Sequence, residues 1–351
     1  MQTFVYNALP SRVIFGQGTL AQLADEVRAL GCMRALVLTT APQSEQGQHL
    51  CQLLGDLAVG VFNNATMHTP VDVTEEALRV VEQSRADCLV AIGGGSTIGL
   101  SKALALRTDL PQIVIPTTYA GSEVTPIIGQ TEAGLKTTQR TLKVLPEVII
   151  YDVDLTLSLP ADLTVTSGLN AIAHAVEALY SKDANPLISL LAQEGIAAIS
   201  RALPAIHRDP SDIEARADAL FGAWTCGTCL GAVGMSIHHK LCHTLGGSFN
   251  LPHAPTHAVI LPHAVAYNSA AAPEAMALIA RALGTDDAAR GLFDLAQKSG
   301  APTTLAELGM TAEDIDRATE VACASPYWNP RPIEAEGIRT LLTNALEGRR
   351  P

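Results

Sequence analysis

The stretch CLVAIGGGSTIGLSKALAL, residues 88–106, joins a run of strand-forming residues to a run with helical spacing through three consecutive glycines. Glycines lack a Cβ atom and let the backbone approach a ligand, and the free N–H groups at a helix start favour a phosphate. Gly93, Gly94, Gly95 and Ser96 are therefore candidates for binding the pyrophosphate of a dinucleotide. The pattern is not the GxGxxG fingerprint, so a purely structural turn is an equal alternative at this point.

The same alternation of strand and helix extends over the first 155 residues or so. Five short β-rich apolar runs are strand candidates: 35–39, 58–62, 88–92, 112–116 and 148–152. Between them, segments such as 20–30 and 73–86 space their apolar residues as one-sided helices do. This alternation predicts a Rossmann-like parallel sheet with helices on both faces. The ligand site of such a sheet lies beyond the carboxyl ends of its strands.

A second polar turn, IPTTYAGSEVTP at residues 115–126, follows the next strand candidate. Its hydroxyl-bearing residues are Thr117, Thr118, Tyr119 and Ser122. Taken alone, such a loop could simply satisfy its own backbone. Because two neighbouring turns share one sheet edge, we expect both to bind the cofactor, and we add Lys143 to the candidates.

The end of the first clear strand predicts the choice of cofactor. NAD-specific sites usually place an acidic residue near such a strand end, where it accepts from the ribose hydroxyls and repels a 2′-phosphate. Here the strand ends in Thr39 and Thr40, which are uncharged and are themselves cofactor-binding candidates. We therefore expect both NADH and NADPH to be accepted.

After residue 158 the pattern changes to long stretches rich in Ala and Leu, such as 186–206 and 273–283. We predict two domains, a dinucleotide-binding α/β domain at 1–158 and an all-helical substrate and catalytic domain at 159–351. A cleft between them is the expected site.

The helical half holds most of the chain's ten histidines. Seven of the ten lie in two segments, SGLNAIAHAVEALY and the stretch 235–264, and they are His174, His238, His239, His243, His253, His257 and His263. Asn170 and His174 are four residues apart, as are His239 and His243, so each pair shares one face of a helix. Gly246 and Gly247 are expected to end the second of these helices. So dense a set predicts a functional site.

Three of these imidazoles, in their neutral form, could bind zinc or ferrous iron if an ion is present. The expected fourth contributor is Asn170, a neutral and weak ligand that does not offset a divalent charge. We therefore predict a site without metal. In it, protonated or donor-oriented histidines and Lys240 would hold an anionic substrate.

Composition excludes other classes of function. The formal charge of −12 and the absence of a Lys/Arg run disfavour nucleic acid. No basic and apolar leader and no run of 18 apolar residues occur, which predicts a cytoplasmic protein without a membrane partner. The seven cysteines are scattered, and Cys226 and Cys229 lack a second pair for a zinc site, so we expect a structural role for them.

These motifs together resemble the iron-containing alcohol dehydrogenases over essentially the whole chain. The stretches that carry the likeness are GGGS, PTT…GSE, SGLNAIAHAVE, HHKLCHTLGG…LPHA and NPRP at 329–332. The resemblance implies a dehydroquinate synthase-like fold and a homodimer. Within the family the chain looks most like the branch that acts on maleylacetate, which implies NAD(P)H-dependent reduction of its carbon–carbon double bond to give 3-oxoadipate in the degradation of aromatic compounds.

The family's site residues carry over position by position. Its aspartate ligand matches Asn170, its three histidine ligands match His174, His239 and His253, and a histidine placed to assist proton transfer matches His243. Two further departures are Gly99, where many relatives have Asp, and a PTT turn that is one residue shorter, with Tyr119. The departures agree with the maleylacetate branch and argue against iron or zinc dependence.

The implied chemistry adds hydride to the alkene carbon β to the ketone and leaves an enolate that needs donors. His243 is the first candidate to protonate it, with His174, His239, His253 and Asn170 around the substrate, Lys240 as a weaker candidate and Tyr119 or water as substitutes. A metal-dependent alcohol or glycerol dehydrogenase is the alternative of the same class. A lyase of the dehydroquinate synthase type and a non-catalytic NAD-binding protein are the others.

Overall fold

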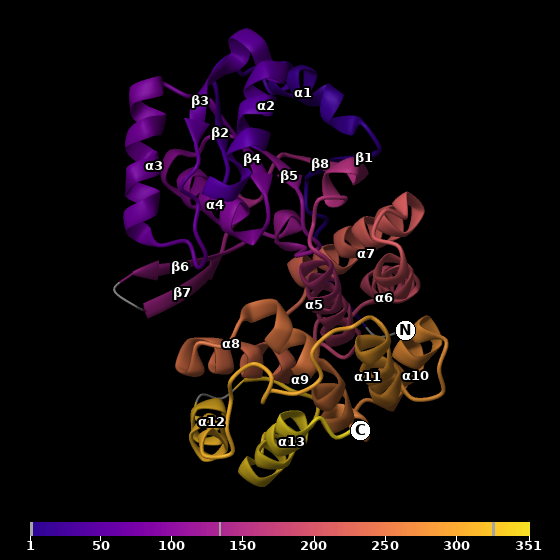
Figure 1. Ribbon diagram of the computed structural model, residues 1–351. Helices are drawn as coiled ribbons and strands as arrows, with labels where there is room; N and C mark the ends of the chain where they lie inside the picture. The colour runs from indigo at the N-terminus through magenta and orange to yellow at the C-terminus, as the bar shows by residue number, and fades with distance from the viewer. Residues whose placement is uncertain (1–2, 133–134, 325–326) are drawn as a thin grey trace. The chain divides into compact units, whose positions relative to one another are not determined.

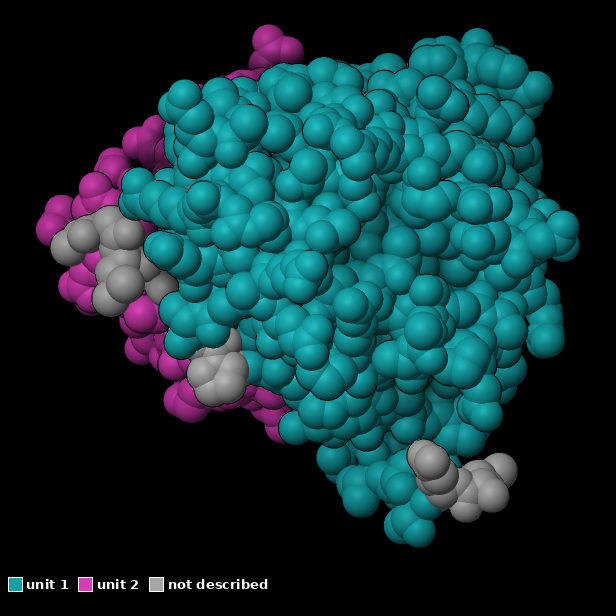
Figure 2. Space-filling model, turned by 90° about the horizontal axis from the view of Figure 1, so that it is seen from below, with its two compact units in different colours: residues 1–7, 160–351 teal, residues 8–159 magenta. Residues whose placement is uncertain are grey.

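The protein is described by a computed structural model that covers residues 3–132, 135–324 and 327–351. The chain divides into two compact units (Figure 2): an α/β unit of residues 8–159, and a helical unit of residues 1–7 and 160–351. The sequence predicted a boundary between residues 158 and 159, with every earlier residue in the α/β domain. Residues 3–7 instead group with the helices, because the described part of the sheet begins only at Arg12.

The α/β unit contains one six-stranded sheet in which all neighbours run parallel. The strands are β1 (Arg12–Gly16), β2 (Ala35–Leu38), β3 (Ala58–Phe62), β4 (Cys88–Gly93), β5 (Gln112–Pro116) and β8 (Val148–Asp152). Their order is β1-β8-β5-β4-β2-β3, so β4 lies in the interior between β5 and β2 (Figure 1). The turns after β2, β4 and β5 therefore follow three adjacent strands.

Helices cover both faces of this sheet, as the sequence predicted. The helices are α1 (Leu23–Ala29), α2 (Ser44–Leu54), α3 (Val71–Ser84) and α4 (Gly95–Thr108). Successive residues of a strand point to opposite faces. Val37 of β2 accordingly packs in one cluster with α1 and α2, whereas Leu36 and Leu38 pack in another with α3 and α4. Each face buries its own apolar core, which accounts for the continuous apolar runs of the central strands.

The five predicted strands are present, and three more were not predicted. β1 is a half-exposed edge strand, so its apolar alternation is weak. β6 (Ile127–Glu132) and β7 (Leu135–Arg140) pair antiparallel in a separate two-stranded sheet. Their sequences are rich in polar residues, because this hairpin has no face in the main core. In the sequence, neither the weak alternation of β1 nor the polar composition of β6 and β7 can be distinguished from that of a loop.

The described part of the helical unit contains nine helices and no strand, which confirms the predicted helical half. Their bounds are α5 (Ala161–Leu179), α6 (Pro186–Arg208), α7 (Ile213–Ala232), α8 (Ile237–Phe249), α9 (His253–Asn268), α10 (Pro273–Leu283), α11 (Ala288–Lys298), α12 (Asp314–Cys323) and α13 (Ala335–Glu347). α5, α6 and α7 pack against one another, and α8, α9, α12 and α13 share an apolar cluster. Figure 1 shows α5 beside α9, and the two helices pack together.

One helix end differs from the prediction. α8 continues through Gly246 and Gly247 and ends at Phe249, after which Asn250 adopts the left-handed conformation with φ of 54°. Asparagine tolerates this conformation at a helix end, and it therefore takes the capping role that the sequence assigned to the glycines.

None of the described helices is, taken singly, long and apolar enough to cross a membrane. α7 and α8 meet the same test of length and composition only as a pair bent by 95°. Many of the residues of both helices are buried within the helical unit.

Candidate active site

The glycine turn of the α/β unit begins at the end of β4. Gly93 has a φ of 147°, and a Cβ atom there would lie 2.6 Å from Thr97 Oγ1 and 2.9 Å from Gln43 Oε1. A Cβ on Gly95, at the first position of α4, would meet no atom within 4 Å. The first N–H groups of a helix have no partner within it. Gly93 is therefore required by the fold itself, whereas Gly95 leaves open space at the start of a helix.

Gln43, which the sequence did not single out, joins the three adjacent turns. Its side-chain oxygen accepts from Thr40 Oγ1 at 3.1 Å, and its Nε2 donates to Thr117 Oγ1 at 3.2 Å. The backbone N–H of Thr117 donates to Gly93 O at 3.0 Å. The structure thus brings Thr40, Gly93 and Thr117 together at one edge of the sheet. Only the strand order could have indicated Gln43, because it lies far from the glycines in the sequence.

The second predicted turn packs against the first. A Cβ on Gly94 would lie 2.9 Å from Thr118 Cγ2, and Thr118 Oγ1 is buried with no hydrogen-bond partner among the described residues. Tyr119 is fully buried. Ser122 Oγ is also buried and lacks a described partner. Buried hydroxyls without partners are uncommon in folded proteins, and a ligand is one way to satisfy them.

A buried lysine forms hydrogen bonds with the backbone of this turn. Lys102 Nζ donates to Ser122 O at 2.6 Å, Thr125 O at 2.7 Å and Ile127 O at 2.9 Å. Burial lowers the pKa of Lys102 to about 7, and the nearby carboxylate of Glu123 opposes the shift. Glu123 in turn accepts from Tyr151 OH at 2.7 Å. A charged residue inside an apolar helix was the signal for this support, and the sequence prediction did not use it.

The structure does not bring Lys143 to these turns. Its ammonium group lies 3.4 Å from Asp109 Oδ1, just after the C-terminus of α4. The glycine turn is at the other end of that 14-residue helix, a distance of about 20 Å at 1.5 Å per residue. A lysine side chain is too short to span it.

Gly99 has a steric explanation. It lies on α4, and a Cβ at this position would run into the Thr69 side-chain hydroxyl. Thr69 is buried and has a positive φ of 47°, which is unusual for a threonine. A larger residue at position 99 would require the Thr69 side chain to shift.

In the helical unit, three helices bring six histidines into a series of ring contacts. α5 carries His174, α8 carries three and α9 carries two: His238, His239, His243, His253 and His257. Ring centroids lie 5.0 Å apart for His174 and His239, 5.0 Å for His239 and His257, and 4.3 Å for His253 and His257. His243 contacts His239 at 6.2 Å and His253 at 6.4 Å. Six of the seven predicted histidines therefore converge.

One of the seven predicted histidines, and the lysine predicted to act with them, contact other side chains. His263 packs its ring against Phe293 at 6.4 Å between centroids. Lys240 places its ammonium group over the ring of Tyr327, 5.7 Å from the centroid. The expectation that Lys240 helps to hold an anion among the histidines therefore lacks support, because its charge faces an aromatic ring.

Burial favours the neutral form of three histidines of the cluster, His174, His238 and His257. It lowers the pKa of His174 well below the ordinary value, and the neighbouring His239 and His253 lower it further. The pKa values of His238 and His257 are lowered in the same way, first by burial and then by neighbouring histidines. Protonated histidines were one expected means of holding a substrate anion. His174, His238 and His257 can bind it only as neutral N–H donors.

Glu177 is the carboxylate of this cluster, and the sequence prediction missed it. It lies on α5, three residues after His174, and its side chain is fully buried. Its Oε2 accepts from His239 Nδ1 at 2.8 Å and from Ser236 N at 2.9 Å, and its Oε1 accepts from His238 N at 2.8 Å. The available signal was an acidic residue in the otherwise apolar helix SGLNAIAHAVEAL.

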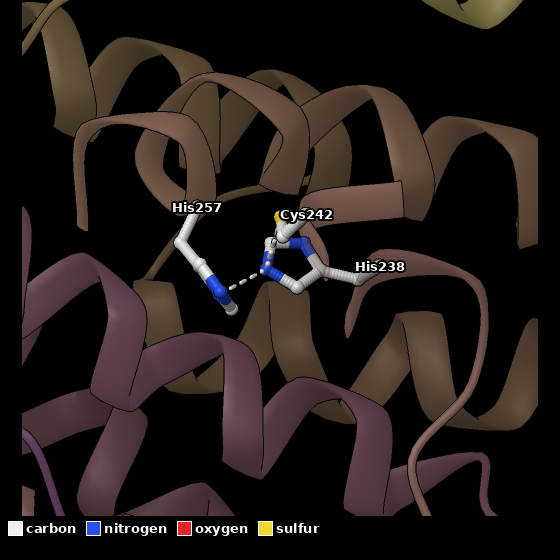
Figure 3. Close-up of side chains that lie close together, drawn as sticks. All are labelled: His238, Cys242 and His257. Atoms are coloured by element: carbon white, nitrogen blue, oxygen red, sulfur yellow. Dashed lines mark hydrogen bonds between the residues drawn. The ribbon is translucent and has the colours of Figure 1, made fainter. Parts of the chain in front are cut away.

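A second group of possible ligands lies beside the first (Figure 3). His238, Cys242 and His257 are all buried, and their ligand atoms lie within 4.8 Å of one another. His238 Nε2 is 3.0 Å from His257 Nδ1 and 3.6 Å from Cys242 Sγ. These distances are those of hydrogen bonds, so the three facing atoms already interact with one another without an ion.

Among the residues that the family resemblance assigns to a metal ion, Asn170, His174 and His239 each have a buried ligand atom without a hydrogen-bond partner among the described residues. These atoms are Asn170 Oδ1, His174 Nδ1 and His239 Nε2. Two imidazoles bound to one ion through bonds of about 2.1 Å place their centroids about 5 Å apart, which is the separation of His174 and His239. Neutral imidazole is also the form that binds metals.

Comparisons with known proteins agree along the whole chain. Residues 10–153 match the family model of iron-containing alcohol dehydrogenases, and residues 164–346 match the C-terminal model of the same family. The curated maleylacetate reductases of Rhizobium sp. (strain MTP-10005) and Burkholderia cepacia are each 57% identical over all of this chain and all of their own length. The crystal structure of maleylacetate reductase from Agrobacterium tumefaciens has a TM-score of 0.98 and 58% identity, with full coverage of both chains.

These matches overturn the prediction of a site without metal, because the matching family is the iron-containing one. The prediction weighed only the neutral Asn170. It did not count the neutral state of the buried histidines or the carboxylate of Glu177 directly behind His239. The fold and the recognised family are confirmed, and the enzyme is an oxidoreductase. The chain belongs to the iron-containing alcohol dehydrogenase family.

Proposed function

We propose that this chain reduces the carbon–carbon double bond of maleylacetate to give 3-oxoadipate, with NADH or NADPH as the hydride donor. The observation that carries the proposal is the full-length identity of 57% to two curated maleylacetate reductases. The metal-dependent alcohol and glycerol dehydrogenases are the alternative within the family. A solved 1,3-propanediol oxidoreductase is only 26% identical to this chain, which favours the first activity.

The reaction needs one hydride, one proton and a place for negative charge. Hydride adds to the alkene carbon β to the ketone, electrons move to the ketone oxygen, and the enolate then takes a proton at its α carbon. We propose His243 as the proton donor, because it lies at the edge of the cluster in ring contact with both His239 and His253.

His174, His239 and His253, with the amide oxygen of Asn170 beside them, would hold the family's metal ion. When bound, such an ion supplies a Lewis acid that polarises a ketone oxygen. The chain's own contribution is to keep the imidazole of His174 neutral by burial and to fix His239 through Glu177.

The nucleotide is proposed to bind at the carboxyl edge of the sheet. The helix start at Gly95 and the partnerless hydroxyl of Thr118 support this assignment. Neither Thr39 nor Thr40 carries the charge that would repel a 2′-phosphate, so we expect the kcat/KM values for NADH and NADPH to differ by less than about a hundredfold. A larger ratio would argue against this choice.

The decisive experiment follows NADH absorbance at 340 nm after addition of freshly prepared maleylacetate, with product identification by mass spectrometry. The expected result is one NADH consumed for each 3-oxoadipate formed. NADH formation from alcohols or glycerol, without consumption on maleylacetate, would support the alternative. A lyase that recycles its NAD, or a protein that only binds the cofactor, would show no net consumption.

We further propose that the enzyme is a cytoplasmic homodimer without nucleic-acid or membrane partners. Light scattering after size exclusion should then give twice the 36.8 kDa of one chain. A mass equal to one chain would contradict the dimer.

A further inference from the structure

Glu177 occupies an unusual position for a carboxylate. It is fully buried in the helical unit, one turn after His174 on α5, and it contacts the beginning of α8. Both of its oxygens accept hydrogen bonds from backbone N–H groups, Oε2 from Ser236 at 2.9 Å and Oε1 from His238 at 2.8 Å. Burial of a carboxylate is costly unless such donors satisfy it. This carboxylate is satisfied on each oxygen.

These contacts make Glu177 the cap of α8. Ser236 is the N-cap residue of that helix, yet its side chain makes no capping hydrogen bond, and its Oγ has no partner among the described residues. The first N–H groups of a helix need acceptors and carry partial positive charge. The carboxylate of Glu177, on α5, supplies the hydrogen-bond acceptor that the side chain of Ser236 does not provide. It thereby links the start of α8 to the helix that carries His174.

The same carboxylate also fixes one histidine. Glu177 Oε2 lies 2.8 Å from His239 Nδ1, and a carboxylate that already accepts two backbone N–H groups acts as an acceptor here as well. His239 Nδ1 must then carry the proton, because neutral imidazole has one N–H and one lone pair. The lone pair remains on Nε2, which is buried and has no described partner.

We propose that Glu177 is a positioning residue of the active site. It holds His239 in the Nδ1–H form, with the Nε2 lone pair available to the ion. Its carboxylate, which contacts His239, also supplies the negative charge that Asn170 does not provide. A carboxylate that orients a ligating histidine raises the basicity of that ligand, and changes to such partners typically cost 10- to 100-fold in metal affinity or activity. The inference rests on the histidine site of the proposed function but not on the identity of the substrate.

The first test uses the unaltered protein without bound metal. Nitrogen-15 NMR of histidine-labelled enzyme reports which ring nitrogen of each histidine carries the proton, and comparison with His239→Gln assigns the signals of residue 239. We expect the Nδ1–H form of His239. Finding the Nε2–H form would overturn the proposal, whether or not any variant at position 177 folds.

The second test measures affinity for Co²⁺ in competition with a chromophoric chelator, for the wild type and for Glu177→Gln. Glutamine keeps the shape of the side chain, but it loses the charge and turns an N–H group toward one of the donors. We expect 10- to 100-fold weaker binding with circular dichroism like that of the wild type. A folded variant that binds Co²⁺ within twofold of the wild type would contradict the proposal.

Asp152 provides a matched control in the α/β unit. It is a buried carboxylate that accepts from the backbone N–H groups of Gly18 at 3.0 Å and Leu20 at 2.8 Å. Asp152→Asn should lower stability in a comparable way while leaving Co²⁺ affinity unchanged. An equal loss of affinity in both variants would mean that general destabilisation, and not positioning of His239, explains the effect. Neither measurement involves maleylacetate, so this proposal and the proposed substrate can fail separately.

Discussion

Gln43 Nε2 donates a hydrogen bond to Thr117 Oγ1 over 3.2 Å, and this contact joins the loop after β2 to the loop after β5 across the end of β4. The other side of the same amide accepts from Thr40 Oγ1. One side chain therefore sets the spacing of the turns that are proposed to surround the cofactor.

Loss of this side chain should weaken cofactor binding. In Gln43→Ala the turns lose two hydrogen bonds, each worth about 1 kcal/mol, and we expect a roughly tenfold higher Kd for NADH. Quenching of NADH fluorescence measures the change. Gln52→Ala, an exposed position on α2, the helix that begins just after Gln43, serves as the control. A Kd for Gln43→Ala equal to that of the control would disprove this role.

Substitution of Gly95 can distinguish an effect on ligand binding from an effect on folding. Because a Cβ at this position meets no atom within 4 Å, Gly95→Ala should leave the free energy of unfolding unchanged or raise it by up to about 1 kcal/mol. The Kd for NADH should nevertheless rise at least about tenfold, since the methyl group occupies the space proposed for the pyrophosphate. Gly247→Ala, an equally open helical glycine in the other unit, should show the stability effect alone. Unchanged NADH binding in Gly95→Ala would remove the pyrophosphate from this turn.

Removal of His243 tests the proton donor. We expect His243→Ala to lower kcat by about 10²- to 10⁴-fold, the usual contribution of general acid catalysis, with little change in the Kd for NADH. Steady-state kinetics with maleylacetate and fluorescence binding together distinguish these effects. If most of the turnover remains, the proton must come from another group, such as Tyr119 or water.

The metal content of the purified protein tests the proposed metal site. Protein purified without chelator should contain about one iron or zinc ion per chain, and chelation should lower turnover. His174→Ala and His239→Ala should each retain only a small fraction of the ion, as measured by plasma mass spectrometry. His263→Ala removes a buried histidine that packs on Phe293 outside the cluster, so it should keep the ion. Equal metal loss in all three variants would point to unfolding and not to ligation.

His263 also predicts how stability depends on pH. Burial lowers its pKa to about 4, against about 6.5 in an unfolded chain. Between pH 6.5 and 4 the unfolded chain therefore takes up a proton that the folded chain does not, so stability falls as pH falls and the loss is complete below pH 4. The full difference amounts to about 3 kcal/mol.

Urea unfolding at pH 7 and pH 4.5 measures this dependence. His263 lines a cavity of about 360 Å³ together with Arg331, Glu334 and Glu336, whose charges also face it. Comparison with His263→Gln isolates its own contribution, and the variant should lose less stability on acidification than the wild type. Identical losses would show that this histidine does not titrate as described.

The sequence by itself determined the order of strands and helices and the presence of both candidate sites. Runs such as CLVAI at 88–92 and VII at 148–150 are apolar on every residue because both faces of their sheet are covered, and that signal is local. The histidines were visible as a dense set, and spacing of four residues placed His174 with Asn170 on one helix. Weak local signals were missed, as in the half-exposed β1 and the polar β6–β7 hairpin.

Only the tertiary structure decided which polar groups meet. Glu177 and His239 are 62 residues apart in the chain, and Gln43 and Thr117 are 74 apart, so no local pattern relates them. Burial likewise set the charge state of the histidines, because the pKa of an imidazole depends on the solvent that surrounding helices remove. The prediction of a site without metal failed for this reason: it counted the charge at one position, while the charge that matters came from another side chain that folding brought beside the ligands.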